Sequence, residues 1–275
     1  MLHRNQGKAW DQHFLPRLSR KQIAEMDKED VLIVQPIGAV EQHGAHLPTF
    51  TDTLVNESFL TYAFEALPDD APIWLLPPLP YGKSTEHLGH SGTISLSATT
   101  LIGLLQDIAR SLQLSGFRKL VFYNTHGGNV DVLNLVGREI RIETGLAVFH
   151  IQSPVVPDPA LFPASGQRID IHGGDAETSL VLAARPHWVD MKLAVDEFPQ
   201  LPADSSIQLK SKTFAWIIDD LSDSGIVGYA TVASKDYGTH LFERGGQALA
   251  KLLLECAAFD MKNLKLHPKS MEALQ

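Results

Sequence analysis

The stretch that decides the fold is Leu120-Val121-Phe122-Tyr123-Asn124-Thr125-His126-Gly127-Gly128-Asn129. Its first five residues form a short apolar run, which is typical of a buried strand. A glycine-containing turn follows, and the apolar residues from Val130 to Ile140 have helical spacing. Residues 147–151 are apolar again and predict another strand. A strand, a helix and a second strand in this order predict a βαβ unit with parallel strands.

The same alternation extends in both directions along the chain. Further strands are predicted at residues 31–37 and 73–76, and further helices at residues 52–67, 97–116, 175–184 and 240–260. Ser97 is a typical N-cap residue, and Gly116 is a typical residue at a helix C-terminus. We therefore expect an α/β fold in which helices flank a mainly parallel central sheet.

The 275 residues contain no low-complexity tract and no Ser/Gly-rich linker. We therefore expect a single domain over residues 1–275, with residues 1–25 and 262–275 peripheral. Residues 153–170 are rich in proline and predict a long loop, which would serve as a lid or a subunit contact. Residues 187–235 show no clear periodicity and receive no assignment.

The composition bears on partners and location. A net charge of −9 argues against nucleic acid and anionic membrane as main partners. The first residues lack the apolar core of a signal peptide, and no apolar run approaches the roughly 18–20 residues of a membrane span. One cysteine, Cys256, cannot form an intramolecular disulfide. These features predict a cytoplasmic protein with no membrane partner.

Polar residues with metal-binding side chains follow the predicted strands. Glu41 and His43 lie two residues apart, so an extended backbone points both side chains to the same side. Asp52 begins a predicted helix, His126 follows the clearest strand, and Glu177 lies early in another helix. Ligands gather at the carboxyl ends of parallel strands. Two imidazoles and three carboxylates could hold two divalent ions, with one carboxylate bridging.

Each of these residues also has an ordinary structural interpretation. A single histidine after a strand is usually a surface or hydrogen-bonded residue, which is one interpretation of His126. Glu41 alone could be a loop charge, and Asp52 alone could be a helix N-cap. Their shared position at predicted strand ends favours a site, although spacing alone would also fit a polar rim.

Four sequence blocks, between about residues 30 and 245, resemble the creatininase (creatinine amidohydrolase) family. They are Pro36-Ile37-Gly38-Ala39-Val40-Glu41-Gln42-His43-Gly44-Ala45-His46-Leu47-Pro48 with Thr51-Asp52-Thr53, Tyr81-Gly82-Lys83-Ser84-Thr85-Glu86-His87 with Gly92-Thr93-Ile94-Ser95, Asn124-Thr125-His126-Gly127-Gly128-Asn129, and His172-Gly173-Gly174-Asp175-Ala176-Glu177-Thr178-Ser179. The blocks occur in the family's order.

The resemblance implies an α/β fold, a homohexamer and two divalent ions per chain. Glu41, Asp52 and His126 would hold one ion, and His43, Asp52 and Glu177 would hold the other. His172 matches a histidine to which the family assigns proton transfer. We therefore expect His172 and Glu177 to take part in the reaction itself. Mixed imidazole and carboxylate ligands suit zinc, manganese or iron.

The chain also departs from the family pattern at two places. In creatininase proper the third block reads His-Tyr-Glu-Asn, and its glutamate is a ligand, whereas this chain has Gly128 there. Glu177 is the natural replacement. Creatinine-hydrolysing members also carry tryptophans in the loop before the fourth block, and residues 153–171 contain only Phe162 as an aromatic residue. The departure at Gly128 implies that a ligand comes from elsewhere or that the second metal site is weaker. The loop departure argues against creatinine as the substrate.

The resulting functional hypothesis is hydrolysis of a non-peptide C–N bond, in a linear or cyclic amide, by water activated between two metals. The expected partner is a small-molecule amide. A formamide deformylase and a modified-peptide hydrolase are alternatives within the family. A non-catalytic metal-binding scaffold is an alternative from another class.

Overall fold

Four parallel strands form the central sheet of the computed structural model, which describes residues 6–153, 170–201, 207, 209 and 213–261. The strand order is β2-β1-β3-β4. The strands are β1 (Leu32–Ile37), β2 (Ile73–Leu75), β3 (Lys119–Asn124) and β4 (Ala147–Gln152). All residues of β1 and β3 are buried, because these two strands lie in the middle of the sheet and are covered on both faces.

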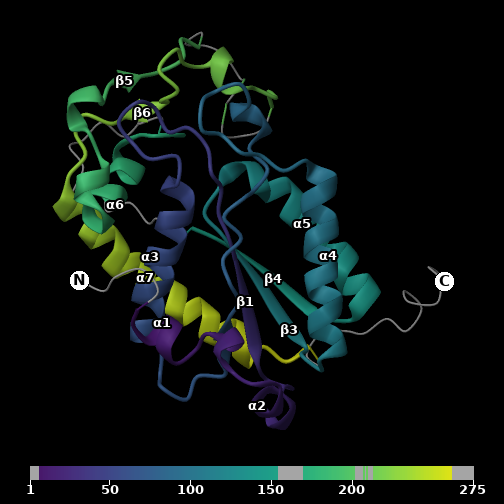
Figure 1. The fold of residues 1–275 in the computed structure, drawn as a ribbon. Coiled ribbons are helices and arrows are strands. Elements are labelled where there is room, and N and C mark those ends of the chain that lie inside the picture. Colours follow the sequence, from purple (N-terminus) through teal and green to yellow (C-terminus); the bar gives the residue numbers. More distant parts are fainter. Residues whose placement is uncertain (1–5, 154–169, 202–206, 208, 210–212, 262–275) are drawn as a thin grey trace.

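Helices cover both faces of the sheet (Figure 1). The helices are α1 (Lys8–Asp11), α2 (Arg20–Glu25), α3 (Thr51–Ala66), α4 (Ala98–Leu114), α5 (Val130–Thr144), α6 (Asp175–Ala184) and α7 (Lys235–Ala258). On β1, Leu32 and Val34 pack in the core with α3 and α7, whereas Ile33 packs with α4 and α5. This alternation follows from the two-residue period of a strand. The mainly parallel sheet with flanking helices confirms the predicted fold class.

Two helix boundaries show how local chemistry sets the ends. Ser97 caps α4 by accepting a hydrogen bond from the backbone N–H of Thr100 at 3.1 Å, as its sequence position predicts. Helix α7 begins five residues before the predicted start at His240. Ser234 caps it by accepting from the N–H of Tyr237, so the helix begins at Lys235.

The N-terminal segment is more deeply packed than we expected. Ala9 and Trp10, in α1, are buried in the core that contains α3 and α7. The carbonyl of His13 accepts a hydrogen bond from the N–H of Leu75, and Phe14 forms a β-bridge with the same residue. Residues 8–15 therefore close the β2 edge of the sheet and are not peripheral. The expectation for residues 262–275 falls outside the described residues.

Residues 187–235 receive no assignment from sequence patterns, and the described part of this region contains short elements before α7 begins at Lys235. Two-residue strands β5 (Asp196–Glu197) and β6 (Gly228–Tyr229) pair antiparallel. The 3-10 turns of the chain are η1 (Leu15–Arg17), η2 (Thr85–His87), η3 (Gly127–Asn129), η4 (Pro186–Trp188), η5 (Met191–Leu193) and η6 (Ile218–Asp220). The predicted loop at 153–170 lies almost wholly outside the described residues.

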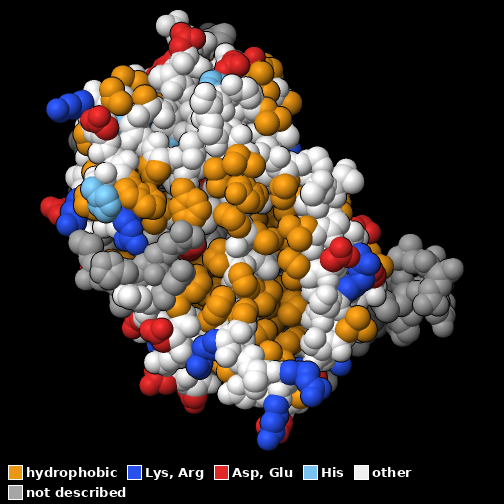
Figure 2. Space-filling model, viewed as in Figure 1, with side chains coloured by type: hydrophobic (Ala, Val, Ile, Leu, Met, Phe, Trp, Pro, Cys, Tyr) orange, Lys and Arg blue, Asp and Glu red, His pale blue; other side chains and the backbone are white. Residues whose placement is uncertain are grey.

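Hydrophobic side chains gather along the middle of the face shown in Figure 2. In the same view in Figure 1, the coil that joins β2 to α4 runs up this face. That coil carries three large hydrophobic side chains with substantial exposure, Tyr81, Leu88 and Ile94. Within the described ranges, no helix has both the length and the apolar character needed to cross a membrane.

Candidate metal centre

The ligand candidates meet at the carboxyl end of the sheet. Strand β1 leads into the loop that carries Glu41 and His43, and β3 leads directly to His126. Asp52 lies in the first turn of α3, and Glu177 lies in the first turn of α6. Parallel strands bring these separate segments to one edge, so the fold places all five predicted ligands together.

The first group consists of Glu41, Asp52 and His126. Their side chains are almost fully buried, with exposed fractions of 1%, 4% and 4%. His126 Nδ1 lies 3.3 Å from Glu41 Oε1 and 3.4 Å from Asp52 Oδ2. One ligand atom from each residue falls within 4.8 Å of the other two. This geometry suits a single divalent ion between the three side chains.

His43 faces a second pair of carboxylates. Its Nε2 lies 3.6 Å from Asp52 Oδ1 and 3.7 Å from Glu177 Oε2. The two oxygens of Asp52 therefore face different histidines, as a bridging carboxylate requires. Glu177 is more exposed than the others, at 28%, and its Oε2 also accepts from the N–H of Gly173 at 2.7 Å. His172 lies close enough to join the group of His43 and Glu177.

Backbone carbonyls fix which ring nitrogen of each histidine faces the carboxylates. His43 Nδ1 donates to the carbonyl of Glu41 at 3.1 Å, so the lone pair is on Nε2. His126 Nε2 donates to the carbonyl of Lys83 at 2.9 Å, so the lone pair is on Nδ1. Metal-binding histidines are held by outer hydrogen bonds of this kind.

Three buried atoms of the centre have no hydrogen-bond partner among the described residues: Glu41 Oε2, His43 Nε2 and Asp52 Oδ2. Buried polar atoms are usually paired, because leaving one unpaired costs about 1–3 kcal/mol. Here lone pairs and negative charges face one another in a buried space. One cation beside Glu41, Asp52 and His126 and a second beside His43, Asp52 and Glu177 would satisfy these atoms, so the donor set fits a binuclear centre.

The pKa values of the centre show that its carboxylates also favour protons on the neighbouring histidines. Burial lowers the pKa of His43, but Asp52 and Glu177 outweigh it and raise the pKa to about 10. Burial likewise disfavours the charged form of Glu41, but His126 and the neighbouring histidines hold the Glu41 pKa well below its usual range. The centre therefore favours positive charge between its carboxylates.

His172 lies beside the ligand groups. Its Nε2 donates to the carbonyl of Gln42 at 2.6 Å, and its Nδ1 lies 3.6 Å from Glu41 Oε1. The His172 backbone forms an isolated antiparallel bridge with Val227, the residue just before β6, and this bridge helps to hold it. Burial, together with the charge on His43, lowers the pKa of His172. The ring is thus neutral, with a lone pair directed at the centre.

Sequence reasoning gave no role to His87, which the structure places in the centre. Its ring stacks on that of His172 with centroids 4.2 Å apart, and its Nε2 lies 3.5 Å from Glu41 Oε1. Glu41, His87 and His172 form a third group of potential ligand atoms. The only sequence signal was its presence in the second family block, because His87 follows Gln42 by 45 positions and lies in the coil after β2, where no periodicity places it.

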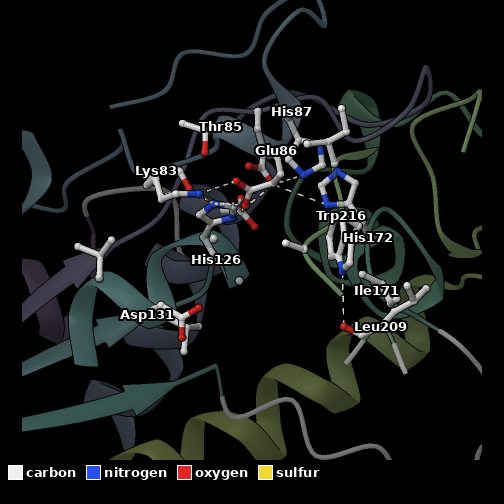
Figure 3. Close-up of a pocket in the computed structure, with 18 of the residues that line it drawn as sticks. Lys83, Thr85, Glu86, His87, His126, Asp131, Ile171, His172, Leu209 and Trp216 are labelled. Carbon is white, nitrogen blue, oxygen red and sulfur yellow. Dashed lines mark hydrogen bonds and ion pairs between the residues drawn. The ribbon is translucent and has the colours of Figure 1, made fainter. Parts of the chain in front are cut away.

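A cavity of about 670 Å³ opens from the centre (Figure 3). Lys83, His126 and Asp131 lie on one side of it, and Ile171, Leu209 and Trp216 lie on the other. Trp216 comes from the previously unassigned region, and its Nε1 donates to the carbonyl of Leu209. An aromatic side chain therefore lines the cavity, although it comes from a different segment than the loop at 153–171.

Comparisons with known proteins agree with this geometry. Residues 16–253 match the model of the creatininase family, described as creatinine amidohydrolase. The chain is 34% identical over 215 residues to a mycofactocin precursor peptide peptidase of Mycobacterium ulcerans (strain Agy99), covering 76% of this chain and 79% of the relative. It is 32% identical over 263 residues to a creatinine amidohydrolase of Pseudomonas putida, covering 88% and 96%.

The fold comparison points the same way. A solved structure described as creatininase with Mn superposes with a TM-score of 0.72 and 29% sequence identity, covering 90% of this chain and 100% of that chain. The matched family model spans both the ligand loop after β1 and the helix that carries Glu177. The chain therefore belongs to the creatininase family of hydrolases.

Proposed function

We propose that the protein is a two-metal amidohydrolase. In this proposal Glu41, Asp52 and His126 hold one divalent ion, and His43, Asp52 and Glu177 hold the other. The observation that carries it is the set of buried atoms without a hydrogen-bond partner among the described residues, Glu41 Oε2, His43 Nε2 and Asp52 Oδ2, gathered in one cluster of carboxylates and imidazoles. Zinc, manganese and iron all suit such ligands, and solved structures described as creatininase with Mn and as a mutant creatininase of Zn-Zn type support manganese and zinc alike.

The reaction we propose is hydrolysis of a C–N bond at an acyl carbon. The bound ions would supply a water of lowered pKa as the nucleophile and would polarise the carbonyl. His172 is suited to proton transfer, because its Nε2 is fixed on the carbonyl of Gln42 while its Nδ1 faces the centre. In this role His172 Nδ1 takes up a proton and passes it to the leaving nitrogen. Glu177 would hold the second ion together with His43 and Asp52.

Metal stoichiometry separates the hydrolase from a non-catalytic scaffold. We expect about two equivalents of zinc or manganese per chain after reconstitution and desalting, measured by mass spectrometry of the metals. His126→Ala should lose one equivalent and the activity. His172→Ala should keep both ions and lose activity, because this residue moves a proton. A folded wild-type protein that retains no metal would contradict the proposal.

The cavity favours a substrate larger than creatinine. A cavity of about 670 Å³ lies in the usual range for sites that enclose drug-sized ligands. Its apolar side includes Phe214 and Trp216, which suit an apolar substituent. A modified peptide is therefore our second candidate substrate. The similarity to the mycofactocin precursor peptide peptidase of Mycobacterium ulcerans supports it.

A panel of amides on the reconstituted protein tests these candidates. It should contain creatinine, N-formyl compounds, other linear and cyclic amides, and short peptides with apolar residues. Trp216→Ala should raise KM for the apolar members by about tenfold and leave metal content unchanged, because Trp216 lies outside the ligand groups. If creatinine were hydrolysed best and Trp216→Ala had no effect, the larger substrate would be excluded.

We also propose that the chain forms a homo-oligomer, with the family's hexamer as the expected size. The hydrophobic side chains that gather on the face in Figure 2 support this, because exposed apolar surface of this kind often marks an interface. Light scattering coupled to size-exclusion chromatography measures the mass directly. A monomer at micromolar concentration would contradict this proposal without affecting the metal centre.

A further inference from the structure

Gln42 and His87 form a hydrogen-bonded pair beside the metal centre. We propose that His87 donates a hydrogen bond from Nε2 to the carbonyl oxygen of the substrate as charge develops on it, and that Gln42 is the positioning residue that puts the proton on Nε2. This inference rests on the proposed hydrolase function. It assigns His87 to the reaction and excludes it from metal binding.

The orientation of the Gln42 amide is set by two backbone groups. Its Oε1 accepts from the N–H of Gly44 at 2.8 Å, and its Nε2 donates to the carbonyl of Gly225 at 3.0 Å. A flipped amide would place its NH₂ against an N–H and its oxygen against a carbonyl. Gly225 has a φ of 80°, and a β-carbon there would collide with the Gln42 amide. The backbone thus fixes which end of the amide meets His87.

The fixed amide decides the tautomer of His87. Gln42 Nε2 donates to His87 Nδ1 at 2.9 Å, so Nδ1 must carry a lone pair. The proton of the neutral ring is therefore on Nε2. A doubly protonated ring would bring two donors together at Nδ1. Nε2 then has no lone pair for a metal, although its position among Glu41 and His172 would otherwise suit one.

His87 differs in this respect from the other histidines of the centre. His43, His126 and His172 each donate to a backbone carbonyl and direct a lone pair at the centre. Only His87, among these four, accepts from its outer partner and directs an N–H inward. Three histidines thus direct lone pairs at the centre, and one directs an N–H. The lone pairs can bind a metal or accept a proton, whereas the N–H can stabilise a negative charge.

The position of the His87 N–H fits an oxyanion donor. Glu41 Oε1 lies 3.5 Å from it, which is longer than the 2.7–3.2 Å of an ordinary N–H···O bond. The ring is almost fully buried, lines the cavity, and stacks on His172 with centroids 4.2 Å apart. A carbonyl oxygen bound between the metals and His87 would receive this hydrogen bond while the leaving nitrogen faces His172.

Replacement of His87 tests the donor role by metal content and by rate. We expect His87→Ala and His87→Gln both to keep about two metal equivalents. His87→Ala should lower kcat by about 10²–10³-fold on the best amide of the panel with little change in KM, as for removal of one oxyanion donor. His87→Gln keeps an N–H donor and should recover part of the loss. His90→Gln, a similar change at a partly exposed residue of the same loop, should behave as wild type.

A second readout does not need turnover. With Co²⁺ in the site, the visible spectrum reports binding of acetohydroxamate, whose carbonyl oxygen serves as a probe for the donor. His87→Ala should bind this probe about tenfold more weakly. In Gln42→Glu the carboxylate would accept a hydrogen bond from His87 Nδ1–H and so favour the tautomer with its lone pair on Nε2. This variant should therefore lower kcat as strongly as His87→Ala. In the double variant the two losses should not add.

Each outcome discriminates. Loss of one metal equivalent in His87→Ala would make His87 a ligand and overturn the proposal. Unchanged kcat and unchanged acetohydroxamate affinity would overturn it as well, and additive losses in the double variant would remove Gln42 from the mechanism. A wild-type protein that binds metal and hydrolyses amides keeps the proposed function in all these cases, whereas absence of metal or hydrolysis in wild type overturns both.

Discussion

The carboxylate of Glu86 occupies the space that a side chain at Gly128 would need. A β-carbon on Gly128 would collide with Glu86 Oε1, with the carbonyl oxygen of Lys83 and with the ring of His126. Glu86 also lies 3.8 Å from His126 Nε2 and pairs with Lys83 Nζ at 3.0 Å. The glutamate that creatininase proper carries in this block is thus absent, and Glu86 brings a carboxylate there from another loop.

Gly128→Ala should therefore disturb the metal centre through His126. We expect the free energy of unfolding to fall by about 1–3 kcal/mol. The carbonyl oxygen of Lys83 belongs to the backbone and the ring of His126 is held by hydrogen bonds, so neither can move freely. Metal affinity should fall as well. Gly127→Ala is the matched control, since a β-carbon there meets nothing within 4 Å. Denaturant titration and metal analysis measure both effects, and equal behaviour of the two variants would refute the steric explanation.

Asn129 holds three loops together beneath the centre. It is fully buried; its Nδ2 donates to the carbonyl of Gly38 and to Asn124 Oδ1, each at 3.0 Å, and its Oδ1 accepts from the N–H of Lys83 at 2.8 Å. Asn129→Ala should cost about 3 kcal/mol of unfolding free energy, because buried partners lose their hydrogen bonds. Asn134→Ala, on the exposed side of α5, should change little. A loss below about 1 kcal/mol would contradict this role.

Glu197 should make the stability of the β5–β6 region depend on pH. Its carboxylate accepts from Ser222 Oγ, the N–H of Asp223 and the N–H of Ser224. Burial opposes the charged form, but these donors lower the pKa of Glu197 from 4.5 to about 2. A depressed carboxylate pKa stabilises the fold above the unfolded pKa, and this contribution is lost as pH falls through the folded value.

Glu197→Gln tests this dependence. The variant should be less stable than wild type at neutral pH, and the difference should narrow as pH falls from about 4.5 toward about 2. Denaturant unfolding at several pH values measures it. Glu139→Gln, at an exposed position on α5, serves as the control. A difference that stayed constant over this range would show that the charge of Glu197 is not involved.

Chelation should lower the thermal stability of the whole fold. Glu41 and Asp52 are buried close together, and each disfavours the charge of the other when no cation lies between them. At free metal about 100-fold above Kd, each ion adds about 2.7 kcal/mol to the free energy of unfolding. Tm should therefore rise with metal concentration and fall on treatment with EDTA. An unchanged Tm would show that metal binding does not stabilise the fold.

The fold and the predicted ligands were accessible from the sequence because both rest on periodicity and on the geometry of parallel strands. Short apolar runs predicted β1 and β3, and the residues after them had to meet at one edge of the sheet. Glu41, His43 and His126 accordingly lie together. Asp52 was found because a helix start is visible in sequence.

The role of His87 could not be predicted, because it depends on how irregular loops fold against each other. Its tautomer depends on Gln42, whose amide is fixed by Gly225 from a distant part of the chain. The position of Trp216 at the cavity could not be predicted either, since residues 213–217 have neither helical nor strand periodicity. Loops held by individual hydrogen bonds leave no repeating pattern in a sequence.

The origin of Trp216 also bears on how such enzymes diverge. Most of the proposed ligands come from the first half of the chain, between Glu41 and His126, whereas one apolar wall of the cavity comes from residues 209 and 214–217 in the second half. Mutations in that later stretch can change the shape of the substrate cavity without altering the proposed metal ligands. Selection for a new substrate can therefore act on one part of the gene while the reactive machinery is inherited unchanged.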